Sequence, residues 1–416
     1  MDLHRVREFY WSASDKWALI LFTINKSNRI FGKSVVDSYL KKYVIGVRPA
    51  LAALPDNCAE QAVRWLTKAQ DAREDKGVSY GYFPCGEKMG WRPSYPETTG
   101  YIIASLIDYA KAQKDDDILN RAVAMAEWET KIQMASGAVQ GGMATSSDKQ
   151  KAAVFNTGMV LQGWTAVYRQ TNDAGIFEAG RKAADFLVTD MDARGHYRTH
   201  GGFVSANQIK TYNVLCSWAL YRFGEDSNEE IYKKAALKNA EATLGMQLAN
   251  GWFESCCLTH SEKPLTHTLG YTLQGLLEIG ILAQREDFIS AVEKGVEPLI
   301  RNIKPNGYLA GRFDRSWKSK AAYSCLTGSA QIAIVLYRIA QIFGKSDYID
   351  AADRLVDFLK ALQVRGCPDL NMNGAIAGSF PLLGGYMTAG YPNWATKYFL
   401  DALLLQKNHW EKQKRG

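Results

Sequence analysis

One stretch of the chain, from Ile231 to Ala283, reads IYKKAALKNAEATLGMQLANGWFESCCLTHSEKPLTHTLGYTLQGLLEIGILA. It starts with an amphipathic, Ala-rich segment, Ile231–Gln247, and passes through a turn at Gly251-Trp252-Phe253. It ends in a second and more apolar segment, His267–Ala283. In both segments the apolar residues recur at intervals of three and four, which is typical of helices. The stretch therefore predicts two helices joined by a glycine turn.

The same pattern recurs six times along the chain, which indicates a repeat architecture. The turn glycines are Gly81, Gly137, Gly195, Gly251, Gly307 and Gly374, at intervals of 56, 58, 56, 56 and 67 residues. The amphipathic segments that precede them are Ala62–Gln70, Ile118–Gln133, Phe177–Thr189, Ile231–Gln247, Phe288–Ile303 and Tyr348–Gln363. The apolar segments that follow are Glu97–Ala112, Asn156–Gln170, Tyr212–Phe223, His267–Ala283, Cys325–Phe343 and Asn393–Leu405.

Twelve helices of two alternating kinds predict an all-α fold, the (α/α)6 barrel. The apolar helices line the inside of the ring and the amphipathic helices cover them, so that each hairpin buries its face against its neighbours. We expect the barrel to form one domain over residues 51–416, with residues 1–50 as an N-terminal helical extension. All six glycine turns lead into inner helices, so they lie on one rim of the barrel. Because loops on a rigid scaffold carry function, the functional site is expected at this rim.

Composition narrows the class of protein. The chain has 416 residues, with 47% hydrophobic and 22% charged side chains and a formal net charge of +7 that is spread along it. Without a basic block, nucleic acid is not an expected partner, whereas the mild positive excess suits an acidic small molecule or glycan. Seven irregularly spaced cysteines, a charged start and an early apolar run of only eight residues, Trp17 to Ile24, predict a cytoplasmic protein without disulfides or a transmembrane segment. The oligomeric state is left open.

Polar residues open the inner helices at the predicted rim: Glu97, Asn156, Tyr212, His267, Cys325 and Asn393. Helix capping could explain Asn156, Thr266 and Asn393, but it does not explain Glu97, His267 or Tyr212. The connecting loops add aromatic and charged residues: Trp91, Arg92, Tyr95, Trp252, Glu254, His260, Arg312, Asp314, Trp317, Tyr391 and Trp394. Aromatic rings stack on sugar rings and Arg binds carboxylates in two-pronged fashion, so the rim is expected to hold a sugar-binding cleft.

Three stretches carry a family resemblance. They are Pro264-Leu-Thr-His-Thr-Leu-Gly-Tyr271, Cys325-Leu-Thr-Gly-Ser-Ala-Gln331, and Gly378-Ser-Phe-Pro381 with Tyr391-Pro-Asn-Trp-Ala395. They resemble a group of uncharacterised proteins encoded in bacterial exopolysaccharide clusters, and the six repeats over about residues 55–406 resemble the six-hairpin glycosidase superfamily. The resemblance implies work on an oligo- or polysaccharide. It does not choose the reaction, because the superfamily includes hydrolases, lyases and sugar epimerases.

Our first hypothesis for the reaction is glycoside hydrolysis, which needs two carboxylates. Glu97 is the candidate general acid, since Tyr95, Trp91 and Pro96 would remove water from it and raise its pKa. Asp314 and Glu254 are its candidate partners; alternatively, Asp314 only pairs with a nearby Arg and Glu254 is solvated.

The second hypothesis is β-elimination or C5 epimerisation of a uronic acid. Asn156 would then cover the carboxylate of the substrate, Arg92 or Arg312 would bind it, and His267, Tyr271 or Tyr212 would move the proton. His267 and Tyr271 are four residues apart, hence on one face of their helix.

Two further alternatives remain. A zinc site like that of lanthionine cyclases could draw on Cys256, Cys257, His260, His267 and Cys325, but adjacent cysteines do not easily face one metal ion. A non-catalytic glycan-binding protein would show rim aromatics without a titratable group of shifted pKa. We expect no metal ion and no cofactor.

Overall fold

The structure is a computed structural model that describes residues 54–86, 89–205 and 208–413. The expected N-terminal extension, residues 1–50, lies outside the described residues.

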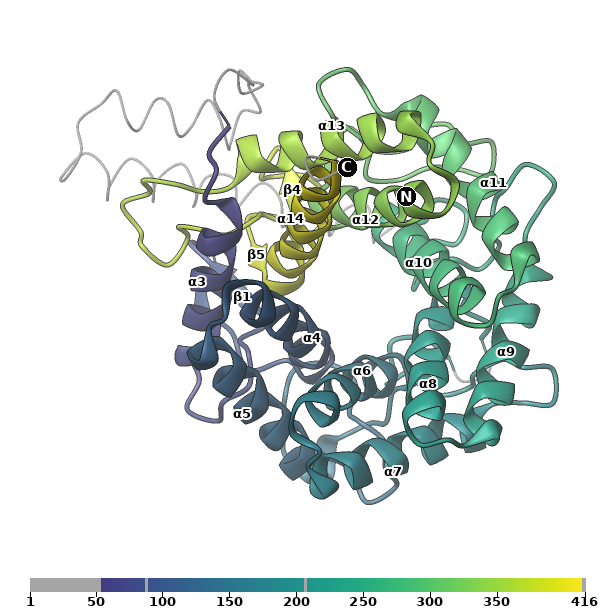
Figure 1. The fold of residues 1–416 in the computed structure, drawn as a ribbon. Helices are drawn as coiled ribbons and strands as arrows, with labels where there is room; N and C mark the ends of the chain where they lie inside the picture. The colour runs from purple at the N-terminus through teal and green to yellow at the C-terminus, as the bar shows by residue number, and fades with distance from the viewer. Residues whose placement is uncertain (1–53, 87–88, 206–207, 414–416) are drawn as a thin grey trace, which may run out of the picture.

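The described residues form twelve α-helices in a closed ring (Figure 1). The inner helices are α4 (Pro96–Gln113), α6 (Val154–Thr171), α8 (Val214–Asp226), α10 (Thr266–Leu282), α12 (Leu326–Phe343) and α14 (Asn393–Gln413). The outer helices are α3 (Cys58–Asp71), α5 (Asp116–Ile132), α7 (Ala174–Asp190), α9 (Glu230–Leu244), α11 (Glu286–Asn302) and α13 (Ser346–Leu362). Inner helix packs against inner helix around the ring, and α14 contacts α4. The predicted (α/α)6 barrel and its assignment of inner and outer helices are confirmed.

The two kinds of helix differ in burial as their sequences require. The outer helix α11 buries one face, with Phe288, Val292 and Val296 beneath a charged surface. The inner helix α12 buries nearly every residue from Leu326 to Ala340. By length and composition α12 could cross a membrane, but 78% of that window is buried inside the barrel. It therefore has the surroundings of a core helix.

The turn glycines hold neighbouring outer helices together. At Gly307, φ is 79° and an added Cβ would stand 1.9 Å from the carbonyl oxygen of Arg354 in α13. At Gly374, φ is 96° and the Cβ would stand 2.2 Å from the carbonyl oxygen of Gln61 in α3. Only glycine fits both the left-handed backbone and the close approach. Since Gly374 belongs to the last repeat and α3 to the first, the second contact closes the ring.

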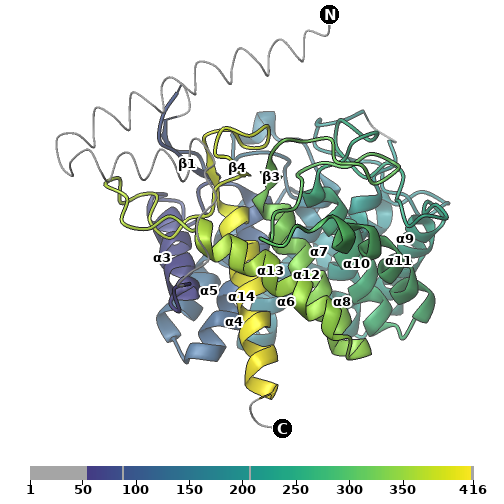
Figure 2. The same cartoon turned by 90° about the horizontal axis from the view of Figure 1, so that it is seen from above.

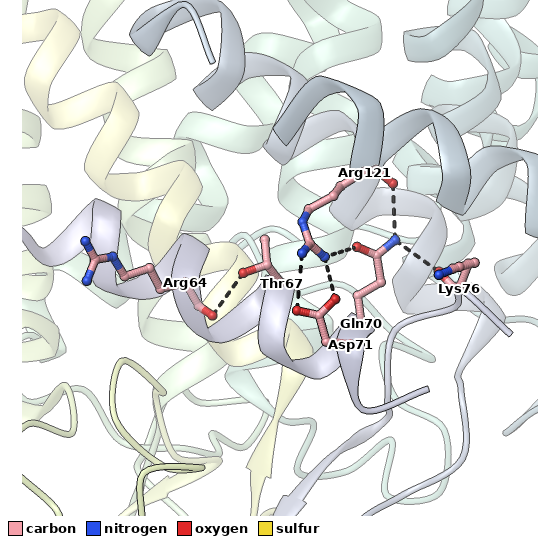
Figure 3. Close-up of polar contacts among 6 residues, drawn as sticks. All are labelled: Arg64, Thr67, Gln70, Asp71, Lys76 and Arg121. Atoms are coloured by element: carbon pink, nitrogen blue, oxygen red, sulfur yellow. Dashed lines mark hydrogen bonds and ion pairs between the residues drawn. The ribbon is translucent and has the colours of Figure 1, made fainter. Parts of the chain in front are cut away.

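The first repeat departs from the predicted turn. Gly81 lies in strand β1 (Gly81–Phe83), and the residue in the left-handed turn conformation is Lys76, with φ 74°. The side chain of Gln70 identifies Lys76 as the equivalent position, because its amide nitrogen donates to the carbonyl oxygens of Lys76 and of Arg121 in α5, each at 3.2 Å (Figure 3). Gln363 does the same in the last repeat, donating to Gly374 and to Cys58 in α3. A search for glycines misses this turn because lysine occupies it.

Short strands lie at one end of the barrel (Figure 2). Strand β1 pairs with β2 (Gly90–Trp91) and with β5 (Tyr391–Pro392), all antiparallel. Strand β3 (Ser324–Cys325) pairs with β4 (Ser379–Phe380). These loops join the first repeat to the last and the fifth to the sixth, so they rigidify the rim at which the inner helices begin. All seven cysteines are buried.

Candidate active site

A cavity of about 330 Å³ lies at the rim that carries the glycine turns. Its walls include eight of the residues selected from the sequence: Tyr95, Glu97, Asn156, Tyr212, His267, Tyr271, Arg312 and Trp394. They come from the starts of α4, α6, α10 and α14, from the 3₁₀ turn Thr211–Asn213 before α8, and from two connecting loops. The repeat thus brings together residues that are far apart in the sequence.

Glu97 is the second residue of α4, whose first position is Pro96. Its carboxylate accepts a hydrogen bond of 2.8 Å from the hydroxyl group of Tyr95. Burial raises the pKa of Glu97 to about 7, and the Tyr95 hydrogen bond, which favours the ionised form, offsets only part of this rise. Near neutral pH a substantial fraction of Glu97 is protonated, which is the state that a general acid requires.

His267, the second residue of α10, has a defined tautomer. Its Nδ1 lies 2.7 Å from the amide oxygen of Gln331. An amide oxygen only accepts, so Nδ1 carries the proton and Nε2 is left as an acceptor. Burial lowers the pKa of His267 to about 4, so the ring is neutral at physiological pH. His267 can therefore accept a proton at Nε2.

Tyr271 lies one helical turn beyond His267, and the two ring centroids are 4.4 Å apart. Its hydroxyl group is buried and has no hydrogen-bond partner among the described residues. Burial raises the pKa of Tyr271 well above its ordinary value, so the hydroxyl group keeps its proton. The cavity thus contains a protonated tyrosine hydroxyl group beside a neutral imidazole.

Arg312 supplies the positive charge. Its Nε donates to the hydroxyl oxygen of Tyr323 at 3.0 Å, and its Nη1 donates to the carbonyl oxygen of Lys263 at 2.9 Å. These bonds orient the guanidinium group at the wall of the cavity, where it can bind a carboxylate. Asn156 is held less freely than expected, since its amide nitrogen donates to the carbonyl oxygen of Gln140 at 2.8 Å.

The structure does not bring Glu254 or Asp314 to the cavity. Glu254 is exposed and lies 3.2 Å from Arg315. Asp314 shapes a turn, accepting from the backbone N–H groups of Ser316 and Lys318. Among the described residues that line the cavity, Glu97 is the one carboxylate. The expected carboxylate pair is therefore absent from the described wall, because local side chains and the turn satisfy both partners.

Several selected aromatic residues pack beneath the rim. Trp252 and Trp317 are buried, with ring centroids 5.2 Å apart, and Trp91 packs on Trp65 at 5.5 Å. Tyr391 and Cys325 are also buried. The five residues selected from the sequence, Trp91, Trp252, Trp317, Cys325 and Tyr391, are not among those that line the cavity.

The remaining selected residues also lie outside the cavity. Arg92 is half-buried next to strand β2, and His260 lies 3.5 Å from Glu262. Asn393 does not cap its helix, because its side-chain oxygen accepts no hydrogen bond within the described residues, while its amide nitrogen donates to Ser79 and Thr98 across the rim. The explanation by helix capping fails for Asn156 and Thr266 as well, since the residues at the N-cap positions of α6 and α10 are Ala153 and Leu265.

Sequence reasoning missed several residues of the wall: Tyr80, Phe155, His200, Phe203, Leu258, Tyr386 and Met387. Cys257, considered from the sequence only as a zinc ligand, also lines the cavity. Phe155 stands directly before Asn156, so the repeat could have shown it. Burial alone would raise the pKa of Cys257, but backbone N–H groups of His260, Leu265 and Thr259 are directed at its sulfur and lower the pKa below the ordinary value. The periodicity of the chain gives no signal for such loop contacts.

Metal binding finds no support in the described part of the chain, where no three His, Cys, Asp or Glu side chains are grouped to hold an ion. The independence from metal ions remains a prediction.

Comparisons with solved structures agree on the architecture. A heparin-specific unsaturated glucuronyl hydrolase superposes with a TM-score of 0.68 at 16% identity, over 85% of this chain and 97% of that one. Unsaturated glucuronyl hydrolase from Bacillus sp. GL1 gives 0.66 at 16% identity, over 84% and 95%. Cellobiose 2-epimerase from Bacillus thermoamylovorans gives 0.66 at 9% identity, over 83% and 97%. No family model and no curated protein sequence matches the chain. The chain therefore shares the (α/α)6 barrel fold of these three proteins.

Proposed function

We propose that the chain is a carbohydrate-active enzyme that releases an acidic sugar from the end of a saccharide, with Glu97 as the proton donor. The observation that carries the proposal is a carboxyl group with a pKa of about 7, set among aromatic residues in a cavity that also holds Arg312. The cavity volume of about 330 Å³ is at the lower end of the range for ligand pockets, which suits the end of a saccharide better than a long segment.

A single carboxylate favours a substrate whose cleavage needs one acid. A uronic acid with a double bond between C4 and C5 meets this requirement, because the ring oxygen makes that bond an enol ether. Glu97 would protonate C4, and water would add to the cation at C5 and pass its proton to Nε2 of His267. The resulting hemiketal opens and expels the sugar attached at C1, so that the net reaction consumes one water molecule. The substrates named for the glucuronyl hydrolases of the same fold support this choice.

Epimerisation at C5 of a saturated uronic acid is the second candidate. It is favoured by one specific arrangement: the neutral imidazole of His267 and the ring of Tyr271 lie on the same helix face, with their ring centroids 4.4 Å apart. Nε2 of His267 would remove the C5 proton, and Tyr212, which comes from another element of the same wall, would return a proton to the opposite face of the sugar ring.

The product distinguishes the two reactions. The protein is incubated with an unsaturated glucuronyl disaccharide, and separately with a saturated uronic acid oligosaccharide in D₂O. We expect loss of the ultraviolet absorbance of the double bond and release of the second sugar. Deuterium at C5 of the saturated substrate, without release of a sugar, would replace the first proposal by epimerisation. Full activity of Glu97→Gln on the unsaturated substrate would remove Glu97 from the mechanism.

Two finer proposals accompany this one. The absence of disulfides among the seven cysteines supports a cytoplasmic location. The resemblance to proteins of exopolysaccharide clusters supports a bacterial exopolysaccharide or a fragment of it as the source of the substrate.

A further inference from the structure

The barrel has a second cavity at the opposite end from the candidate active site, where the inner helices finish. Its volume is about 770 Å³, and all six inner helices contribute to its wall. The two cavities share no lining residue. Figure 2 shows how far this end, at which α14 projects, lies from the strands of the rim. The second cavity is therefore a separate site.

Part of the charge in this cavity is already neutralised by ion pairs. Arg338 holds Glu278 with two hydrogen bonds, of 2.7 and 2.9 Å, and Lys397 lies 2.8 Å from Asp401. Both pairs belong to the wall of the cavity. The charges of these four side chains are therefore compensated without a ligand.

Three other charged residues of the wall form no ion pair with any residue that the structure describes: Asp108, Lys111 and Arg222. Together they carry one net positive charge. Burial and the neighbouring Arg169 lower the pKa of Arg222, and the carboxylates of Asp226, Glu278 and Asp108 offset only part of this effect. An anion bound at Arg222 would supply the missing compensation.

A neutral group of the wall also lacks a partner. Gln274 is 8% exposed, and its amide oxygen receives no hydrogen bond within the described part of the chain. A buried acceptor without a donor is costly, and a ligand hydroxyl group would satisfy it. Next to Arg222 stands Trp218, whose ring centroid is 5.6 Å from the guanidinium carbon and which forms part of the same wall.

We propose that this cavity binds a short acidic saccharide of one or two sugar units. Its carboxylate contacts Arg222 and Lys111, its hydroxyl groups contact Asp108 and Gln274, and a sugar ring packs against Trp218. The combination of a cationic pair, hydroxyl-binding groups and an aromatic wall defines this chemistry, and the volume admits a ligand of this size.

A layer of tyrosines separates the two sites. Tyr398 lines the second cavity and Tyr271 lines the first, with ring centroids 6.0 Å apart. The ammonium group of Lys397, which also lines the second cavity, stands over the Tyr398 ring at 3.9 Å from its centroid. A ligand in the second cavity therefore does not touch the residues of the candidate active site, and the proposal does not rest on the proposed function.

The test uses the full chain with the first site weakened by Arg312→Met, and sodium glucuronate as the probe in isothermal titration calorimetry. We expect one saturable site to remain, with glucose binding at least 10-fold more weakly. Adding Arg222→Met should weaken glucuronate binding at least 10-fold. The matched control is Arg181→Met, which removes an exposed guanidinium that pairs with Glu178 and is not part of the wall. The control should leave binding unchanged.

Three results would overturn the proposal: no saturable binding in the Arg312→Met protein, equal affinity for glucose, or binding that survives Arg222→Met. If Arg222→Met fails to fold by circular dichroism, Lys111→Met and Asp108→Asn replace it, and unchanged binding in both counts against the site. Loss of catalysis in Arg312→Met concerns only the first cavity. Failure of the proposed function is therefore measured by activity, and failure of the second site by glucuronate binding.

Discussion

The proposed reaction depends on the carboxyl group of Glu97 as its proton donor. Because its pKa is about 7, the protonated fraction, and with it kcat/KM, should fall as the pH rises through 7. Glu97→Gln should lower kcat by roughly 10²–10⁴, the usual worth of acid catalysis. The control is Glu254→Gln, an exposed carboxylate outside the cavity, which should keep full activity. Equal rates for the two variants would contradict the role of Glu97.

The same carboxyl group should weaken the fold at neutral and higher pH. Its pKa rises from 4.5 to about 7 on folding, so between these values the unfolded chain loses the proton first and stability falls as the pH rises. Above pH 7 the loss is complete, on the order of 3 kcal/mol. Gln cannot ionise, so Glu97→Gln should unfold at a higher urea concentration than the native protein at pH 8 and at nearly the same concentration at pH 4.5. A gain of equal size at both pH values would argue against a buried ionisable group.

His267 should set the acid limb of the pH profile. Its ring is neutral above about pH 4, so activity that depends on Nε2 should fall below that pH. His267→Ala should reduce activity under either candidate mechanism. His267→Asn keeps a donor for Gln331 but has no basic nitrogen, so it should be impaired by roughly 10²–10⁴ as well. Full activity of the Asn variant would reduce His267 to a positioning residue, and His260→Asn, outside the cavity, serves as the control.

At the level of single residues, the sequence predicts part of the cavity wall. Glu97, Asn156, Tyr212 and His267 could be found because each opens an inner helix, a position that the repeat determines. Asp314 and Glu254 could not be judged, because whether a loop carboxylate faces a cavity or a neighbouring Lys or Arg depends on the path of the loop. Tyr80 and Tyr386 were missed for the same reason.

Among the structural elements, the turn between outer and inner helix restricts the residue type most strongly, at the position of its glycine. Gly307→Ala should be more destabilising than Gly344→Ala, although both glycines have a positive φ, 79° and 65°. The reason is that an added Cβ at Gly307 meets the carbonyl oxygen of Arg354, whereas at Gly344 it meets nothing within 4 Å. We expect about 1–2 kcal/mol for the control, the cost of the left-handed backbone alone, and clearly more for Gly307→Ala in urea unfolding. Equal losses would show that α13 moves aside at little cost.

The helices themselves could be predicted, since each buries a face at a period that its sequence repeats. The first turn could not be located from glycines, because Lys76 adopts the left-handed conformation there with φ 74°. In four of the repeats the turn is marked by a contact rather than by a residue type: the amide nitrogens of Gln70, Gln133, Gln247 and Gln363 donate to the turn carbonyl and to the next outer helix. The path of the rim loops, which decides the cavity wall, has no comparable signal.

For the whole molecule, the decisive feature is that the last repeat packs on the first. Gln363 is fully buried and donates to Cys58 and Gly374, each at 3.0 Å, across this junction. Gln70 makes the same two kinds of bond between the first and second repeats, and an arginine donates to the side-chain oxygen of each glutamine. The two glutamines are therefore a matched pair, one at the junction of the chain ends and one inside the ring.

In a closed ring these two junctions are equivalent, and Gln363→Leu and Gln70→Leu should be about equally destabilising. Each substitution leaves two carbonyl groups without their donor, which costs about 2–4 kcal/mol in total. Urea unfolding followed by both tryptophan fluorescence and circular dichroism should show one transition for each variant, at coincident midpoints. In an open array, Gln363→Leu would instead release α3 and α14 first and split the transition, while Gln70→Leu would not. A split transition confined to Gln363→Leu would therefore show that the ring unfolds as a stack of repeats rather than as one cooperative barrel.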